Sequence, residues 1–388
     1  MDKILLGDLC LPASKNIKLA STDLIDYVDI SSVDNQAKFI TGYTTYEYQD
    51  APSRARKSVS IGDVIISTVR PNLNAVAVFD ITTPNTPVVS TGFCVLSCRD
   101  DVNPRYVYYA CQSREFIRQL VSQATGASYP AVNDKIIRNA LIPNYTLSSQ
   151  NSICDQLDSV QNLINIKKKE NKIFNETIKA RFVETFGDPR LNPNGYPVHQ
   201  LSEYIEFLTS GSRGWAQYCV DDGSEWFITI KNVKDCRISL DNIQPINAPD
   251  NAEAKRTRVQ EGDLLISITA DLGRTGVVSK EIAEHGAYIN QHLTCIRLNR
   301  EVLEPLYVAY FMESPAGKEQ FTSKNQSAVK AGLNFNSINT LQLLIPPKSV
   351  QQEFLAFVAQ VDKSKSVNDR IIDRLQKTKA SLMQEYFG

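Results

Sequence analysis

The sequence predicts an α+β fold in which one unit occurs twice: a domain of mixed and antiparallel strands with short helices, followed by a long helix. Three observations predict it, namely recurring strings, runs of strand-forming residues between turns, and two long helical stripes. With 388 residues, the chain has room for two to three ordinary domains. Hydrophobic residues make up 42% and charged residues 22%, which is typical of a packed protein rather than a disordered one.

Four short strings recur in the same order, between 200 and 203 residues further along the chain. The pairs are 61–67 (IGDVIIS) with 261–267 (EGDLLIS), 106–110 (YVYYA) with 307–311 (YVAYF), 141–143 (LIP) with 344–346 (LIP), and 184–187 (ETFG) with 385–388 (EYFG). A period of this length is too long for a solenoid repeat. The strings therefore indicate a duplicated domain.

Within each copy, short runs rich in Val, Ile, Thr and Tyr are broken by Gly, Pro and Asn, as is typical of strands. Examples are 64–69, 75–79, 227–230 and 264–268. After the Tyr-rich string we expect one short helix in each copy, over 105–121 and 305–321. The predicted boundaries are 1–147 for the first domain, 148–187 for a central long helix, 188–346 for the second domain, and 347–388 for a C-terminal long helix.

Apolar residues recur three or four positions apart along both long helices, the spacing of a helix that packs along another helix. The stripes are Ile153, Leu157, Val160, Ile164, Phe174, Ile178 and Phe182, and then Val350, Phe354, Phe357, Val361, Ile371, Leu375 and Leu382. About 38 residues of helix span roughly 57 Å. We expect the two helices to pair in antiparallel fashion; the alternative is that each packs only on its own domain. Ser349 and Gln352 predict a capping box at the start of the second helix.

The formal net charge is −1, so any nucleic-acid-binding face has to be a segregated patch. No apolar run is long enough to cross a bilayer, and the first residues do not resemble a signal peptide. We therefore expect a cytoplasmic protein without a membrane partner. The eight cysteines are scattered, which predicts reduced core thiols and no metal site.

Known catalytic motifs are absent from the sequence. There is no Gly-x-Gly-x-x-Gly string, no phosphate-binding loop, no Gly-x-Ser-x-Gly elbow, and no Asn/Asp-Pro-Pro-Tyr string of an amino-methyltransferase. The histidines, His199, His285 and His292, all lie in the second copy, so the two copies cannot share a histidine mechanism. Residues 249–255 have the letters of a metal-dependent nuclease centre. Their spacing is too short and the first copy has no counterpart, which predicts a solvated loop.

The whole chain resembles the specificity (S) subunit of type I restriction–modification enzymes. Five segments carry the resemblance: the Gly-Asp strand, an Asn-Gln element, the run from a glycine turn to a proline-capped helix, an early Ser-Gly loop, and the glycine-to-asparagine segment of the first copy. They are 262–267, 290–292, 332–352, 208–212 and 126–133.

The resemblance implies a non-catalytic subunit whose two domains are target recognition domains, each reading one half of a split double-stranded DNA site. It implies that the two helices form a spacer and dock two methyltransferase (M) subunits. These subunits carry S-adenosylmethionine and methylate adenine N6, so this chain itself would bind no cofactor. Motor–endonuclease (R) subunits would join for restriction. Reading heads on one side of B-DNA sit about 34 Å apart, and two unlike domains predict an asymmetric site.

Polar residues in loops next to the expected strands are the candidate DNA contacts, because Lys and Arg bind phosphates and Arg, Asn and Gln pair with base edges. They are Arg54, Arg56, Lys57, Arg70, Asn72, Asn74, Ser128, Tyr129 and Asn133 in the first domain, and Ser210, Arg213, Trp215, Lys231, Asn232, Arg274, Lys330 and Asn334 in the second. The alternative for each is a solvated surface residue, and for Tyr129 and Trp215 a partly buried core residue.

Two other functions remain open. One is an interaction scaffold whose coiled-coil arm binds proteins and whose domains bind no DNA. The other is a self-contained nuclease or methyltransferase with an unrecognised site, against which the missing motifs argue. Only the strings of the family resemblance separate DNA reading from the scaffold.

Overall fold

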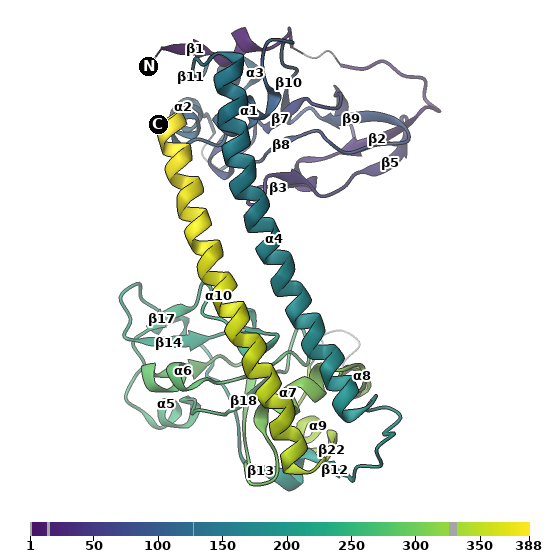
Figure 1. Cartoon of the computed structure of the whole chain (residues 1–388), viewed down its shortest axis with the longest axis vertical. Helices are drawn as coiled ribbons and strands as arrows, with labels where there is room; N and C mark the ends of the chain where they lie inside the picture. The colour runs from purple at the N-terminus through teal and green to yellow at the C-terminus, as the bar shows by residue number, and fades with distance from the viewer. Residues whose placement is uncertain (1, 14–15, 127, 326–331) are drawn as a thin grey trace. The chain divides into compact units, whose positions relative to one another are not determined.

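The computed structural model describes residues 2–13, 16–126, 128–325 and 332–388 (Figure 1). It confirms the α+β fold with two long antiparallel helices, α4 (Leu147–Phe186) and α10 (Lys348–Phe387). Contacts divide the chain into unit 1, Met1–Lys167 with Arg370–Gly388, and unit 2, Lys168–Asp369. Each unit therefore contains one end of each long helix. No helix in the described ranges is both long and apolar enough to cross a membrane.

Unit 1 contains a three-stranded sheet of order β10-β7-β8, a four-stranded sheet of order β5-β2-β9-β6, and the pairs β1-β11 and β3-β4. Its strands are β1 (Lys3–Leu5), β2 (Leu24–Val28), β3 (Val33–Asp34), β4 (Phe39–Ile40), β5 (Thr44–Glu47), β6 (Ala55–Ser58), β7 (Val64–Ser67), β8 (Val76–Val78), β9 (Thr86–Ser90), β10 (Phe93–Leu96) and β11 (Leu141–Pro143). Its short helices are α1 (Pro104–Ala110), α2 (Arg114–Gln123) and α3 (Asp134–Arg138).

Unit 2 contains a six-stranded sheet of order β13-β21-β18-β19-β16-β15, a three-stranded sheet of order β17-β14-β20, and the pair β12-β22. Its strands are β12 (Val198–Gln200), β13 (Ile205–Ser210), β14 (Glu225–Ile228), β15 (Val233–Lys234), β16 (Cys236–Ile238), β17 (Gln244–Ile246), β18 (Leu264–Ser267), β19 (Thr275–Val277), β20 (Ala287–Ile289), β21 (Leu293–Leu298) and β22 (Gln342–Leu344). Its short helices are α5 (Ala252–Thr257), α6 (Lys280–His285), α7 (Pro305–Glu313), α8 (Pro315–Ser323) and α9 (Phe335–Asn339).

The strand registers repeat along with the sequence strings. In unit 1, Ile66 of β7 lies opposite Cys94 of β10; in unit 2, Ile266 of β18 lies opposite Thr294 of β21. The parallel pairs β2·β9 and β14·β20 correspond in the same way. All four residues of β7 and of β18 are buried, which explains their nearly continuous Val, Leu and Ile runs. The duplication therefore extends through the sheets.

The short helix expected after each Tyr-rich string is broken into two, α1 with α2 and α7 with α8. The first segment ends at Ala110 with Cys111 as its C-cap, and Ser113 caps the next segment by accepting from the Phe116 amide at 3.2 Å. Ser314 does the same for the Gly317 amide at 3.4 Å, and Pro315 follows at the first helical position. The prediction of a single helix was wrong because an apolar period does not reveal a cap that restarts the helix.

The long helices pair in opposite directions within each unit. In unit 1, Lys379 Nζ donates to Gln161 Oε1 at 2.6 Å. In unit 2, Lys365 Nζ donates to Asn175 Oδ1 at 2.6 Å, so partner numbers fall along α10 as they rise along α4. The predicted capping box at Ser349 was wrong, because α10 already begins at Lys348.

The end of each long helix completes the core of the domain that the other copy supplies. Phe387, at the end of α10, packs against Tyr106 of unit 1 with ring centroids 5.4 Å apart. Phe186, at the end of α4, packs against Tyr307 of unit 2 at 4.7 Å. Both phenylalanines are almost completely buried. Neither domain therefore has a complete core without the helix of the other repeat.

Candidate nucleic-acid interface

In unit 1, two loops are joined where β7 ends. The loop after β7 spans residues 68–74, and the loop before α3 spans residues 125–133, of which 127 lies outside the described residues. The amide of Arg70 donates to the carbonyl of Pro130 at 2.7 Å, and the amide of Val132 donates to the carbonyl of Thr68 at 2.9 Å. We call these two segments the first loop pair. It brings together candidates that lie about 60 residues apart in the sequence.

The first loop pair exposes a stacked Arg–Tyr pair. The guanidinium carbon of Arg70 lies 4.8 Å from the ring centre of Tyr129, whose side chain is 68% exposed. Asn72 and Ser128 are exposed on the same two loops. A cation held over an aromatic ring in this way is positioned for contact with an anion or a base. The alternative of Tyr129 as a core residue does not hold, and the set is suited to contact a ligand from solvent.

Two other candidates of this region have structural roles instead. The side chain of Asn74 is buried, donates to the Cys111 carbonyl at 2.8 Å and accepts from Lys38 Nζ at 3.0 Å. Asn133 is exposed, but its Oδ1 accepts from the Ile136 amide at 2.9 Å and so caps α3. Asn74 therefore fixes the loop rather than presenting a side chain to solvent.

The basic residues before β7 differ in exposure. Arg54 is exposed, whereas Arg56 is half-buried with its guanidinium carbon 4.8 Å from the ring centre of Tyr48. The Lys57 side chain is 13% exposed and forms an ion pair with Asp134 at 2.7 Å. Of these three, Arg54 is the most accessible, and Lys57 ties β6 to α3.

Unit 2 has the corresponding second loop pair, residues 268–274 after β18 and residues 325–334 before α9. Here 326–331 lie outside the described residues. The Leu333 amide donates to the Ile268 carbonyl at 2.9 Å, which joins the two loops as in unit 1. Ala270 stands where Arg70 stands in unit 1, and both have the left-handed backbone, with φ of 59° and 49°. The two turns share a backbone conformation but carry different side chains.

The candidates in the second loop pair are only partly accessible. Arg274 is half-buried and forms an ion pair with Asp271. Asn334 is exposed and accepts from the Ser337 amide at 2.8 Å, so it caps α9 as Asn133 caps α3. Lys330 lies outside the described residues. His292, which was not among the predicted contacts, also lies at this loop pair, with its Nδ1 2.7 Å from Thr269 Oγ1.

In the early Ser-Gly loop of unit 2, Gly211 is tightly packed and Arg213 is exposed to solvent. A Cβ on Gly211 would lie 2.1 Å from the carbonyl oxygen of Asn290, so no larger residue fits there. Ser210 is half-buried and Arg213 is exposed. Trp215 is only 3% exposed, so of its two alternatives the structure supports the core residue. Arg213 is the accessible member of this group.

The segment 249–255 is solvated at Asp250 and Lys255, as expected, but it is not a loop. Most of it lies in α5, whose N-cap Asn251 accepts from the Ala254 amide at 2.8 Å. Glu253 Oε2 accepts from the buried Trp215 indole at 3.1 Å. The carboxylate of the apparent nuclease string therefore pairs with a core tryptophan.

Three exposed basic residues on and after α5 were not predicted as DNA contacts: Lys255, Arg256 and Arg258. Arg256 stands 200 residues after Arg56, in register with the repeat. Its Nη1 donates to the Ser210 carbonyl at 2.9 Å, which places it beside the Ser-Gly loop. Applying the repeat distance to Arg56 would have found this residue.

Arg258 belongs to a small network with Glu225 and Tyr288. Arg258 Nη1 lies 3.1 Å from Glu225 Oε1, and the Tyr288 hydroxyl donates to the same oxygen at 2.9 Å. Burial, followed by the nearby carboxylate, raises the pKa of Tyr288. The neutral phenol therefore remains a donor at ordinary pH.

Between β14 and β15, Lys231 is exposed while its neighbour Asn232 is buried. Asn232 Oδ1 accepts from the Thr229 amide at 3.0 Å, and its Nδ2 donates to the Ser239 carbonyl at 3.1 Å. An amide with both ends occupied inside the domain stabilises the turn. Lys231 remains the accessible candidate here.

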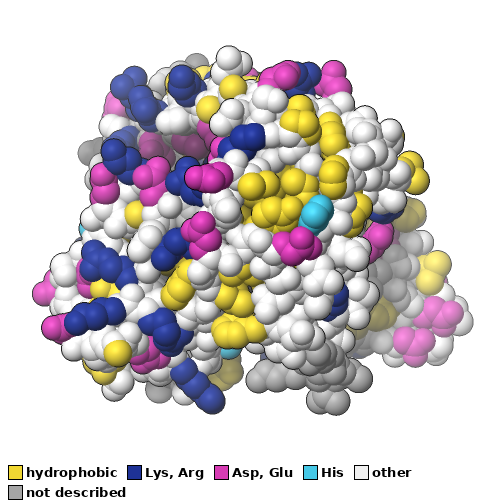
Figure 2. All heavy atoms as spheres, turned by 90° about the horizontal axis from the view of Figure 1, so that it is seen from below, with side chains coloured by type: hydrophobic (Ala, Val, Ile, Leu, Met, Phe, Trp, Pro, Cys, Tyr) yellow, Lys and Arg dark blue, Asp and Glu magenta, His cyan; other side chains and the backbone are white. Residues whose placement is uncertain are grey.

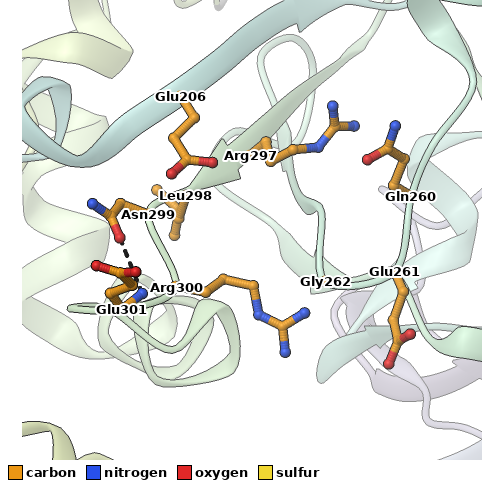
Figure 3. A pocket seen from close by; sticks show the side chains of 9 residues that line it. All are labelled: Glu206, Gln260, Glu261, Gly262, Arg297, Leu298, Asn299, Arg300 and Glu301. Carbon is orange, nitrogen blue, oxygen red and sulfur yellow. Dashed lines mark hydrogen bonds between the residues drawn. The ribbon is translucent and has the colours of Figure 1, made fainter.

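A cavity of about 660 Å³ lies at the opposite ends of β18 and β21 from the second loop pair (Figure 3). Charged side chains of both signs line it, among them Glu206, Arg297 and Arg300. Arg297 donates through Nε and Nη2 to the buried Asp263, each at 2.8 Å. None of the candidate contacts from the sequence lines this cavity.

Charges of both signs are mixed on the surface in the view of Figure 2. Lys and Arg side chains gather toward its left half with Asp and Glu side chains among them, and a hydrophobic patch lies toward the right. On this face the basic residues do not form an unbroken patch. Contacts to phosphates here would depend on individual side chains rather than on a broad field.

The family of the type I restriction modification DNA specificity domain matches residues 236–377. The chain is 18% identical over 294 residues to the specificity subunit of the type I restriction enzyme EcoBI of Escherichia coli, which covers 69% of this chain and 61% of that protein. Residues 236–377 thus match a type I DNA specificity domain, and the chain is similar to type I specificity subunits. The chain spans less than two thirds of the length of that curated relative.

Two solved structures share the fold of this chain. One, from a study of complex assembly and conformational transition of the type I R-M system, is 23% identical, with a TM-score of 0.58, covering 99% of this chain and 97% of that one. The other, an S subunit from M. genitalium, is 14% identical with a TM-score of 0.51, covering 100% and 96%. At these identities the likeness concerns the fold, and it confirms the architecture expected from the resemblance.

Proposed function

We propose that this chain is a type I specificity subunit that reads a bipartite, asymmetric double-stranded DNA site and docks two methyltransferase subunits. In this proposal the chain carries out no reaction of its own and binds no cofactor. S-adenosylmethionine belongs to the methyltransferase partners, and motor–endonuclease subunits join for restriction. Its expected compartment is the cytoplasm, where such a complex meets DNA.

The observation that carries the proposal is the same loop backbone with different side chains in the two repeats. Arg70 and Ala270 occupy one left-handed turn position, and in each repeat the loop that carries this position is joined by backbone hydrogen bonding to a second loop. Phosphate contacts position a protein on DNA, and side chains at base edges specify sequence. Two matched loop frames with unlike side chains fit two heads that read unlike half-sites.

The long helices support the docking part of the proposal. Large apolar side chains remain exposed on α4, including Leu163 at 47%, Ile166 at 51% and Ile173 at 49%. Exposed apolar residues along a helix are typical of surfaces that bind other proteins. We propose that the methyltransferase subunits bind along these helices.

The central experiment uses the full chain together with an amino-methyltransferase partner. DNA exposed to the complex is sequenced for methylated adenine, and the expected result is one bipartite motif with a fixed gap. Methylation without any bipartite motif would overturn the proposal in favour of the scaffold function. Methylation by this chain alone would establish the self-contained enzyme instead.

Single variants test whether the two heads read independently. Arg70→Ala should weaken or relax one half-site, and Arg213→Ala the other, each by about tenfold or more, since one good base contact contributes about 1–3 kcal/mol. Arg99→Ala and Arg300→Ala are matched controls, because these arginines lie beyond the far ends of β10 and β21. Equal loss at both half-sites from either loop variant would contradict independent reading.

Helix length tests the spacer role. Removing four residues from each long helix shortens a helix by about 6 Å, or roughly two base pairs of B-DNA. The gap between the methylated half-sites should shrink accordingly. If the complex with shortened helices still methylates DNA with an unchanged gap between half-sites, the helices do not set that distance.

A further inference from the structure

Cys10 and Cys98 face each other across an antiparallel bridge in unit 1. The Leu11 amide donates to the Ser97 carbonyl at 2.8 Å, and the Arg99 amide donates to the Leu9 carbonyl at 3.1 Å. Because these bonds flank the pair, Cys10 and Cys98 occupy the non-hydrogen-bonded position, where two side chains approach most closely. Both thiols are free in the structure.

The spacing of such a pair suits a disulfide. Residues at a non-hydrogen-bonded antiparallel position have Cα atoms about 4.5 Å apart. Disulfides join residues whose Cα atoms lie roughly 4.4–6.8 Å apart. The pair therefore lies at the short end of the permitted range, and closing the bond requires little backbone movement.

The surroundings favour a reactive thiol at Cys10. The Cys98 thiol lowers the pKa of Cys10 by hydrogen bonding to it, and the Arg138 guanidinium acts in the same direction. Donating that hydrogen bond raises the pKa of Cys98. Arg138 Nε is buried and has no hydrogen-bond partner among the described residues. The thiolate is the nucleophilic form of cysteine, and a nearby guanidinium favours it.

The second repeat shows that the fold does not need thiols at this place. There the same bridge is formed by Ile205 opposite Leu298, and the Asn299 amide donates to the Tyr204 carbonyl at 2.8 Å, as Arg99 does to Leu9. An apolar pair fills the same position of the same strands. The facing cysteines are therefore a feature of the first repeat alone.

We propose that Cys10 and Cys98 form a reversible oxidation site that a small peroxide converts to a disulfide. The Cys10 sulfur attacks a peroxide oxygen, the O–O bond breaks, and the released hydroxide takes a proton to leave as water. The Cys98 sulfur then attacks the sulfenic sulfur of Cys10, and the S–O bond breaks as water leaves with the Cys98 proton. Two thiols are oxidised and one hydrogen peroxide is reduced to two waters.

Access and location define what the bond does. Cys10 is 8% exposed and Cys98 is half-buried, so a small oxidant reaches the pair more readily than a protein does. The bond would join the segment after β1 to the end of β10, and β10 pairs with the strand that leads to the first loop pair. Oxidation thus cross-links two segments of the first domain and leaves the second domain unchanged. This inference goes beyond the proposed function and does not depend on it.

The test uses the reduced full-length chain treated with hydrogen peroxide. Remaining thiols are alkylated, and non-reduced peptides are mapped by mass spectrometry. The expected result is a linked peptide pair containing Cys10 and Cys98 as the dominant disulfide, lost on treatment with dithiothreitol. Full alkylation of both cysteines after oxidation, or links spread over other cysteines, would overturn the proposal.

Two variants separate the site from general thiol oxidation. Cys94→Ala, which removes a buried thiol from β10, should leave the yield of the linked peptide unchanged. The double variant Cys10→Ile with Cys98→Leu copies the second repeat and should fold, yet show no oxidant-dependent rise in the melting temperature of unit 1. In the parent chain we expect a rise of roughly 5 °C. A rise of the same size in the double variant would show that this pair is not responsible.

Discussion

The two repeats agree at the ends of their long helices and differ at their loops. Gln150 near the start of α4 accepts from the Asn103 amide at 2.9 Å and donates to the Tyr145 carbonyl at 2.9 Å. Gln351 near the start of α10 accepts from the Glu304 amide at 2.9 Å and donates to the Pro346 carbonyl at 2.9 Å. Two buried amides thus make the same contacts 201 residues apart.

The loop pairs are built on the same frame but do not share side chains. The left-handed turn after β7 carries Arg70 stacked on Tyr129, whereas the turn after β18 carries Ala270. Side chains of the scaffold are under packing and hydrogen-bond constraints that the loop side chains do not share. The difference indicates that the frame positions the loops and that the loops are where the two halves acquire distinct partners.

The largest expected effect comes from the phenylalanines that end the long helices. Phe186→Ala should destabilise unit 2, and Phe387→Ala unit 1, each by about 3–5 kcal/mol, because a buried ring leaves a cavity. The expected pattern is crossed: a change in the helix of one repeat weakens the domain of the other. Hydrogen exchange resolved by peptide measures each unit separately.

Val183→Ala is the matched control for the first of these variants. Val183 lies on the same turn region of α4 as Phe186 but is 50% exposed. Its truncation should change stability by less than about 0.5 kcal/mol. Faster exchange of unit 1, rather than unit 2, in Phe186→Ala would contradict the crossed packing.

A smaller effect is expected at the two glutamines. Gln150→Leu and Gln351→Leu each remove the partner of a part-buried backbone amide and of at least one backbone carbonyl, which costs about 1–3 kcal/mol. The amides of Asn103 and Glu304 should exchange faster in the respective variants. Gln352→Leu, at the exposed neighbouring position, should not change them. If only one of the two variants destabilised its unit, the two contacts would not be equivalent.

Much of the fold could be predicted because its elements depend on local patterns. The IGDVIIS and EGDLLIS strings mark fully buried strands, and a continuous apolar run indicates burial on both faces. The crossed packing of Phe186 and Phe387 could not be read in this way. A repeat distance shows that both residues occur at the same place, but it does not say which domain each one enters.

The candidate site was harder to predict, because exposure depends on contacts distant in the sequence. Asn232 and Trp215 stand among polar residues, yet both are buried, since the turn closes around the Asn232 amide and Glu253 accepts from the indole. Arg256 was not predicted as a contact although it is exposed, because the residues just before it resemble the string of a metal-dependent nuclease centre. Loop contacts such as Arg70 with Tyr129 join segments about 60 residues apart, which no local pattern reveals.

The smallest expected effect concerns a lysine that holds each loop pair. Lys38 Nζ donates to the Asn74 carbonyl at 2.5 Å, and Lys318 Nζ donates to the Gly273 carbonyl at 2.9 Å. Lys318 also pairs with Glu313 at 2.7 Å. Lys38 is half-buried, and burial lowers its pKa to about 8. The stability of unit 1 should therefore depend on pH through this lysine.

The sign of the effect follows from which state binds the proton. Between pH 8 and the ordinary lysine value of 10.5, the unfolded chain binds more protons at Lys38 than the folded chain does. The contribution of Lys38 to the stability of unit 1 is therefore lowest below pH 8 and rises as pH increases toward 10.5. Relative to Lys38→Gln, the melting temperature of unit 1 should gain roughly 1–3 °C between pH 7.5 and 9.5. Parallel curves for the two proteins across this range would show that Lys38 is not desolvated in the folded state.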